Sequence, residues 1–126
     1  MVEPVRREVV ITAPPEAVWE ALTDAGELAA WFGAEADVDV RPGGPVRFRW
    51  ADGSERRGLV VEVDAPKRLV FRWRELRRSP EGLAVADATV VVFTLEREQD
   101  ATRVTVTESR GVVAADPPLA MAERGR

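Results

Sequence analysis

Cysteine, histidine and tyrosine are all absent from the sequence. Without cysteine the chain has no disulfide, thiol nucleophile or thiolate metal site. Without histidine it has no serine triad, and it lacks the usual ligands of zinc and iron. Any acid–base chemistry therefore depends on aspartate, glutamate or the single lysine, Lys67. These absences favour a binding protein over an enzyme, and we expect no cofactor.

Long apolar runs and an excess of positive charge are lacking as well. No stretch approaches the roughly 20 apolar residues of a membrane span, and the start of the chain is too acidic for a signal peptide. We therefore expect no membrane partner and a cytoplasmic location. The net charge is −4, which disfavours a nucleic-acid partner. At 126 residues, the chain is expected to form a single domain over residues 1–126.

The first third of the chain predicts a strand followed by two short helices. Val9-Val10-Ile11 is an apolar strand that Pro14-Pro15 ends, and Pro15 suits a first helical turn. Asp24-Ala25-Gly26-Glu27 has the capping-box spacing of a second helix. That helix carries apolar side chains at i, i+3 and i+4, namely Leu28, Trp31 and Phe32.

Beyond residue 35 the apolar residues alternate, as in half-buried strands joined by turns. The rows predicted to share one face are Val46, Phe48 and Trp50; Leu59, Val61 and Val63; Leu69, Phe71 and Trp73; Thr89, Val91, Phe93 and Leu95; and Val104 and Val106. Residues 77–82 are expected to form a polar loop. The predicted fold class is α+β, a curved antiparallel sheet with two short N-terminal helices at one side.

The ordered motifs resemble the SRPBCC (START-like, helix-grip) superfamily, specifically bacterial proteins similar to the C-terminal domain of the heat-shock-protein-90 ATPase activator. The resemblance covers about residues 5–110. It rests on Ile11-Thr12-Ala13-Pro14-Pro15-Glu16-Ala17-Val18-Trp19, Leu22-Thr23-Asp24, Leu28 with Trp31-Phe32, Asp39-Val40-Arg41-Pro42-Gly43-Gly44, Gly58, Val63-Asp64-Ala65-Pro66-Lys67-Arg68-Leu69-Val70-Phe71 and Thr102-Arg103-Val104-Thr105-Val106.

The resemblance implies a long C-terminal helix that the sheet grips and that closes a hydrophobic cavity. The tail, residues 111–126, departs from that pattern because Asp116-Pro117-Pro118 interrupts it. A helix after Pro118 would reach only about 12 Å at about 1.5 Å per residue. We therefore expect the gripping helix to be truncated or missing, which would leave the concave apolar face open. A second copy, a partner or a ligand would then cover it, a homodimer being the first expectation.

Three acidic side chains extend the alternating rows to one end of the apolar face: Glu75, Asp87 and Glu108. With Trp50 and Arg57 they form either the polar lip of a ligand cavity or simply the polar ends of strands that enter a loop. Trp31, Trp50 and Trp73 could likewise stack on a flat ligand or belong to the core. Asp37 and Asp39 are interpreted as a solvated edge, and no metal site is predicted.

These patterns predict a non-enzymatic START-like domain that binds a small hydrophobic or aromatic ligand, or a protein partner, on its concave face. A chaperone partner and an ATPase-activator role are implied by the resemblance alone. One alternative is an enzyme of the polyketide cyclase or dehydratase kind, with Glu75, Asp87 or Glu108 as general base. A third hypothesis is an interaction module whose uncovered sheet is the binding surface. The predicted ligand-binding residues are Trp31, Phe48, Trp50, Arg57, Val61, Phe71, Trp73, Glu75 and Glu108.

Overall fold

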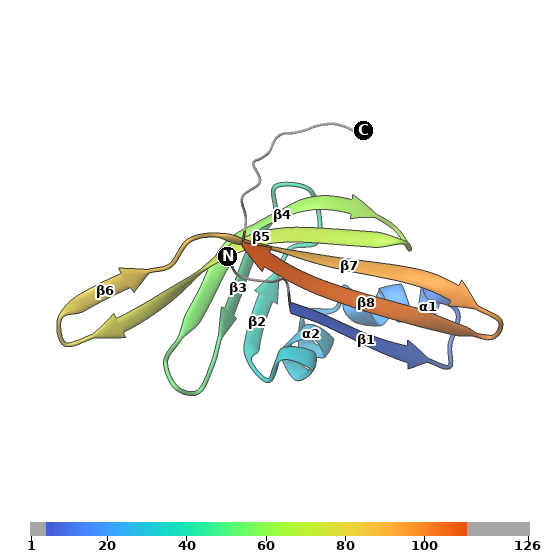
Figure 1. Ribbon diagram of the computed structural model, residues 1–126, viewed down its shortest axis with the longest axis horizontal. Helices are drawn as coiled ribbons and strands as arrows, with labels where there is room; N and C mark the ends of the chain where they lie inside the picture. The colour runs from blue at the N-terminus through green and yellow to red at the C-terminus, as the bar shows by residue number, and fades with distance from the viewer. Residues whose placement is uncertain (1–4, 111–126) are drawn as a thin grey trace.

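The computed structural model describes residues 5–110, which form two helices and one strongly curled antiparallel sheet (Figure 1). The α+β prediction is confirmed. The elements are, in chain order, β1 (Val5–Ile11), α1 (Pro15–Leu22), α2 (Ala25–Phe32), β2 (Glu35–Val38), β3 (Pro45–Arg49), β4 (Glu55–Asp64), β5 (Arg68–Ser79), β6 (Gly82–Val85), β7 (Thr89–Glu98) and β8 (Ala101–Arg110).

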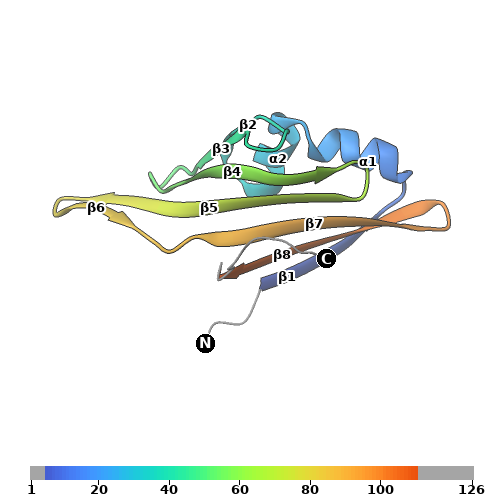
Figure 2. The same ribbon diagram turned by 90° about the horizontal axis from the view of Figure 1, so that it is seen from above.

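The sheet runs in the order β1-β8-β7-β5-β4-β3-β2, and β6 pairs with the end of β5. Both helices lie on one side of the sheet (Figure 2), with α2 next to β2 and α1 in contact with β7 and β8. The predicted loop at residues 77–82 is wrong. β5 runs on to Ser79, and Gly82 begins β6, so these residues form a hairpin that projects from the rest of the sheet (Figure 1).

Both helices begin where the sequence predicts. Pro15 occupies the first turn of α1, where its missing N–H leaves no hydrogen bond unmade. Asp24 caps α2, since its Oδ1 accepts hydrogen bonds from the backbone N–H groups of Gly26, at 2.8 Å, and Glu27, at 3.2 Å. α2 ends at Gly33, whose φ of 67° is a left-handed conformation that glycine adopts without strain.

An aromatic cluster fills the space between the sheet and α2. Phe32 makes edge-to-face contacts with three aromatic rings of the sheet, those of Phe48, Trp73 and Phe93, at centroid distances of 5.0, 5.6 and 6.3 Å. All three sheet residues are almost completely buried, as is Phe71. The expectation of an open apolar face is therefore wrong for the aromatic part of the sheet, because α2 lies over it.

A β-bulge in β4 divides one predicted row, so that Val63 packs against the core as predicted but Leu59 and Val61 do not. The register shifts between Val60 and Glu62, so that Val60 is buried while Leu59 and Val61 are each 54% exposed. The inner row of β4 is Arg56, Gly58 and Val60, not Leu59 and Val61. The prediction that placed Val61 on the concave face is wrong, because one inserted residue exchanges the two faces of a strand.

The prediction of a truncated or missing gripping helix concerns residues 111–126, which lie outside the described residues. Within residues 5–110, neither helix is long and apolar enough to cross a membrane.

Candidate functional site

The inner row of β8 ends at a carboxylate that three other strands contact. Glu108 Oε2 accepts hydrogen bonds from Trp73 Nε1 at 2.9 Å, from Arg56 Nη1 at 2.7 Å and from Thr89 Oγ1 at 2.7 Å. The antiparallel register produces this arrangement: Glu108 lies opposite Val91, which places Thr89 in the diagonal position. We call Glu108, Arg56, Trp73 and Thr89 the Glu108 cluster.

Arg56 is held by two indole rings as well as by the carboxylate. Its guanidinium carbon lies 5.1 Å from the centroid of Trp73 and 5.7 Å from that of Trp50, distances at which cation–π attraction operates. The side chains of Arg56 and Glu108 are 29% and 26% exposed. The ion pair is thus mostly withdrawn from water, but one edge remains accessible to a small molecule.

A hollow of about 140 Å³ adjoins the cluster, lined by Arg56, Glu75, Ala86, Asp87, Thr89, Glu108 and Arg110. The three carboxylates predicted to lie at one end of the sheet therefore do line one hollow. Their surroundings differ, because Glu75 pairs with Arg77 at 2.8 Å and Asp87 is 85% exposed, 3.7 Å from Arg110. Since ligand pockets usually measure several hundred Å³, this hollow has room for one polar group of a ligand.

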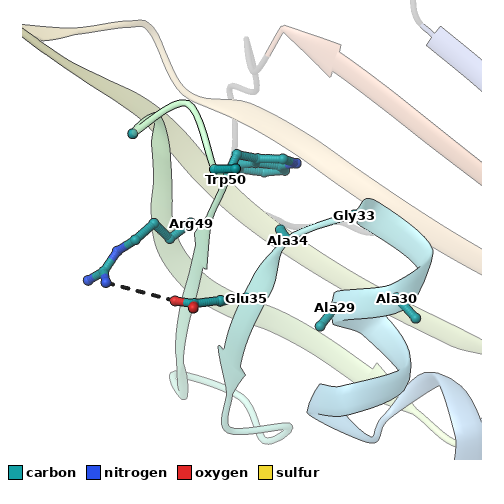
Figure 3. Close-up of a pocket in the computed structure, with 9 residues that line it drawn as sticks. Ala29, Ala30, Gly33, Ala34, Glu35, Arg49 and Trp50 are labelled. Carbon is teal, nitrogen blue, oxygen red and sulfur yellow. Dashed lines mark ion pairs between the residues drawn. The ribbon is translucent and has the colours of Figure 1, made fainter.

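A larger hollow of about 690 Å³ lies between the end of α2 and the turn joining β3 and β4 (Figure 3). Trp50 lines it, and its Nε1 donates to the backbone oxygen of Phe32 at 3.0 Å, which ties the turn to α2. Glu35 and Arg49, an ion pair at 3.8 Å, form its polar wall. Trp50 therefore lies beside both the larger hollow and Arg56 of the Glu108 cluster.

Trp31 lies apart from the other two predicted ring-stacking residues. It lines an apolar groove of about 260 Å³ with Ile11, Ala13, Ala17, Val18, Ala21, Leu22 and Glu27. Its Nε1 is buried and has no hydrogen-bond partner among residues 5–110, and Arg7 lies 5.7 Å from its ring centroid. The three tryptophans predicted to surround a flat ligand thus do not converge on one hollow.

Of the remaining predicted site residues, Phe48 and Phe71 are buried in the aromatic cluster, without exposure to either hollow. Arg57 is on the outer face, where it pairs with Glu55 at 2.9 Å, so the prediction that placed it at the polar lip is wrong. Its neighbour Arg56 takes that place and was not predicted. The signal in the sequence was Gly58. It lies on the inner face, where a Cβ would be 1.8 Å from the backbone oxygen of Arg72, and Arg56, two residues earlier in the same strand, shares that face.

Among the residues that the structure describes, no three acidic side chains are arranged so that they could hold a metal ion. The pKa of Glu55, which lies on the outer face of β4, is clearly shifted. Hydrogen bonds from Arg57 and Arg47 hold its pKa below the usual range.

The chain matches the model of one protein family. The family model described as activator of Hsp90 ATPase homolog 1-like protein matches residues 12–125. A search of curated proteins found no match.

Several solved structures are similar to the chain. Protein MLL2253 from Mesorhizobium loti is 25% identical with a TM-score of 0.72, over 86% of this chain and 76% of that one. DynU16, a putative protein in the dynemicin biosynthetic locus, is 31% identical with a TM-score of 0.72, over 88% of this chain; the chain spans 38% of its length. PFC0360w, an HSP90 activator from Plasmodium falciparum, is 26% identical with a TM-score of 0.62, over 85% of this chain and 72% of that one.

Proposed function

The chain belongs to the family of activator of Hsp90 ATPase homolog 1-like proteins, and we propose that it is a non-enzymatic START-like domain that binds a small hydrophobic or aromatic ligand. The observation that carries the proposal is the Glu108 cluster. Arg56 lies over two indole rings and pairs with Glu108 at one end of the apolar face of the sheet, beside a hollow that fits one polar group. Such a combination of an apolar wall and a few fixed polar groups is typical of ligand sites.

The ligand's polar group would meet Arg56 and the second oxygen of Glu108. Oε2 is fully engaged by three donors, whereas Oε1 accepts no hydrogen bond from residues 5–110. Arg56 likewise uses a single N–H group towards the protein, among the residues that the structure describes. A neutral group that both donates and accepts, such as a hydroxyl or an amide, satisfies this pair without breaking it. The aromatic or apolar body would then lie along Trp50.

The test is titration with a neutral aromatic probe that carries a hydroxyl group, 2-naphthol, followed by quenching of tryptophan emission. Arg56→Met should weaken binding about tenfold, since a hydrogen bond to a charged group contributes about 1.5–3 kcal/mol. The matched control is Arg57→Met, which changes the adjacent residue on the opposite face and should alter the affinity by less than about twofold. Equal affinities for the two variants would contradict the proposal. Native mass spectrometry of the purified protein would report any ligand that it retains.

An enzyme of the polyketide cyclase or dehydratase kind is the second candidate. It is supported by the similarity to DynU16, described as a protein of a biosynthetic locus, and by three carboxylates that line one hollow. Glu108 already accepts three hydrogen bonds on one oxygen, which suits a fixed acceptor better than a base that must take a proton. Unchanged turnover after Glu75→Gln and Glu108→Gln would exclude these two side chains as the general base.

We also propose a homodimer, a cytoplasmic location and a chaperone partner. The dimer is supported by apolar side chains on the inner row of β1, where Val5 is 58% and Val9 is 38% exposed. The chaperone partner is supported by the similarity to an HSP90 activator. Light scattering of the purified protein tests the dimer, and a monodisperse monomer would contradict it.

A further inference from the structure

The outer face of β5 carries a stripe of arginines that lack a counter-charge. Among residues 5–110 every arginine apart from Arg7, Arg72, Arg74 and Arg78 forms an ion pair. Arg7 lies over Trp31, which leaves three. These three alternate with inward-facing residues of one strand, so all of them lie on the same face, and all are exposed.

The carboxylates of Glu62 and Glu55 on that face are already engaged, Glu62 by Arg68 at 3.2 Å. Glu55 is buried, and its Oε2 accepts hydrogen bonds from the Nε atoms of Arg47 and Arg57, both at 2.9 Å. Arg57 lies directly opposite Arg47 on one side and Arg74 on the other, so three arginines stand in register across three strands. Like charges placed directly opposite one another destabilise a sheet. Glu55 offsets the charges of Arg47 and Arg57, whereas Arg74 has no ion pair among the described residues.

Exposed apolar side chains of the neighbouring strands β4 and β6 lie beside these arginines. Leu59, opposite Arg72, is 54% exposed, and Leu83, opposite Arg78, is 49% exposed. Val85 of β6 is 52% exposed on the same face. We call Arg72, Arg74 and Arg78, with these three apolar residues, the outer patch. Figure 1 shows that the hairpin of β5 and β6 extends beyond the rest of the sheet, where a partner can approach it.

We propose that the outer patch binds an extended acidic segment of another protein. Its carboxylates would meet the three arginines and its apolar side chains would contact Leu59, Leu83 and Val85. Two further observations favour a peptide. β6 pairs only with β5 among the described strands, so its free edge offers backbone groups that an extended chain can use. The net charge of −4 opposes large polyanions such as nucleic acid or an anionic membrane, whereas a short segment meets mainly the local charge. A second copy would bring the same arginines face to face.

The proposal is tested with a fluorescein-labelled peptide of alternating glutamate and valine, by fluorescence anisotropy at low salt. We expect the triple variant Arg72→Gln/Arg74→Gln/Arg78→Gln to raise the Kd about tenfold, because three exposed ion pairs are lost. The matched control is Arg6→Gln/Arg41→Gln/Arg97→Gln, which removes the same charge from arginines that have partners and should change the Kd less than about twofold. A triple arginine-to-lysine variant of the patch keeps the charge and should still bind the peptide.

Four results would overturn the proposal. The first is no binding of the peptide by the unaltered protein, and the second is an equal loss in the two triple glutamine variants. The third is that phosphatidylserine vesicles or a short DNA duplex bind more tightly than the peptide and that the patch variant loses this binding. That result would assign the surface to lipid or nucleic acid. The fourth is a change of oligomeric state in the patch variant by sedimentation equilibrium, which would assign it to a second copy.

Discussion

Replacing Glu108 by glutamine should destabilise the fold through the charge that it leaves behind. The substitution keeps the size of the side chain but removes the anion, so the guanidinium of Arg56 remains between two indole rings without a counter-charge. Exposed ion pairs contribute about 0.2–1 kcal/mol, whereas breaking a fully buried pair costs about 3–5 kcal/mol. With the two side chains 26% and 29% exposed, we expect a loss of about 2 kcal/mol. For a domain of this size that lowers the Tm by about 8 °C.

Urea unfolding followed by tryptophan emission measures this loss. The matched control is Asp87→Asn, which removes a carboxylate from the same hollow, but one that is 85% exposed and 3.7 Å from its arginine. That variant should stay within about 0.5 kcal/mol of the parent. The double variant Arg56→Met/Glu108→Gln should lose less than the sum of the single variants, because it leaves no charge unpaired. If Glu108→Gln lost no more stability than Asp87→Asn, the Arg56–Glu108 pair would contribute no more than an exposed pair.

Three further predictions concern β4. Gly58→Ala should cost about 3 kcal/mol or more, since its Cβ would lie 1.8 Å from the backbone oxygen of Arg72; an unchanged urea midpoint would show that the strands can separate there. Val60→Ala should cost about 2 kcal/mol and Val61→Ala less than about 0.5 kcal/mol, and equal losses would argue against the bulge. The pKa of Glu55 is lowered in the fold, so its carboxylate stabilises the protein above its ordinary pKa of 4.5, and this contribution is lost as the pH falls below that value. Urea midpoints from pH 6 to pH 3 should therefore fall less steeply in Glu55→Gln than in the parent, and parallel curves would contradict the assignment.

Alternation of polar and apolar residues made most of the sheet predictable. In β5, Arg72 and Arg74 flank Trp73 and fix the inner row although Val70 is apolar, and in β8 polar residues flank Val104 and Val106. Both inner rows were therefore assigned correctly and led to Glu108. The helix starts were predictable for a similar reason, because proline and a capping aspartate act through local geometry that does not depend on the rest of the fold.

β4 could not be assigned in the same way. Leu59, Val60 and Val61 are consecutive apolar residues, so the pattern fits equally well with Val60 on the inner face or with Leu59 and Val61 on it. The bulge that decides between these two assignments depends on the neighbouring strand. The error carried over to the site, where Arg57 was chosen in place of Arg56. The cover over the aromatic cluster was missed because the contacts of Phe32 with three strands join residues far apart in the sequence.

The pairing of β1 with β8 also bears on how the protein folds during synthesis. Val5 lies opposite Glu108 and Ile11 opposite Thr102, and β8 is the one neighbour of β1 among the described strands. β1 therefore leaves the ribosome about a hundred residues before β8 and cannot form this ladder until β8 has followed. Contacts so distant in sequence close slowly, and an unpaired apolar strand is exposed to aggregation in the meantime. A circular permutant that joins β8 to β1 through a short hairpin would make this pairing local, and it should refold faster than the natural order.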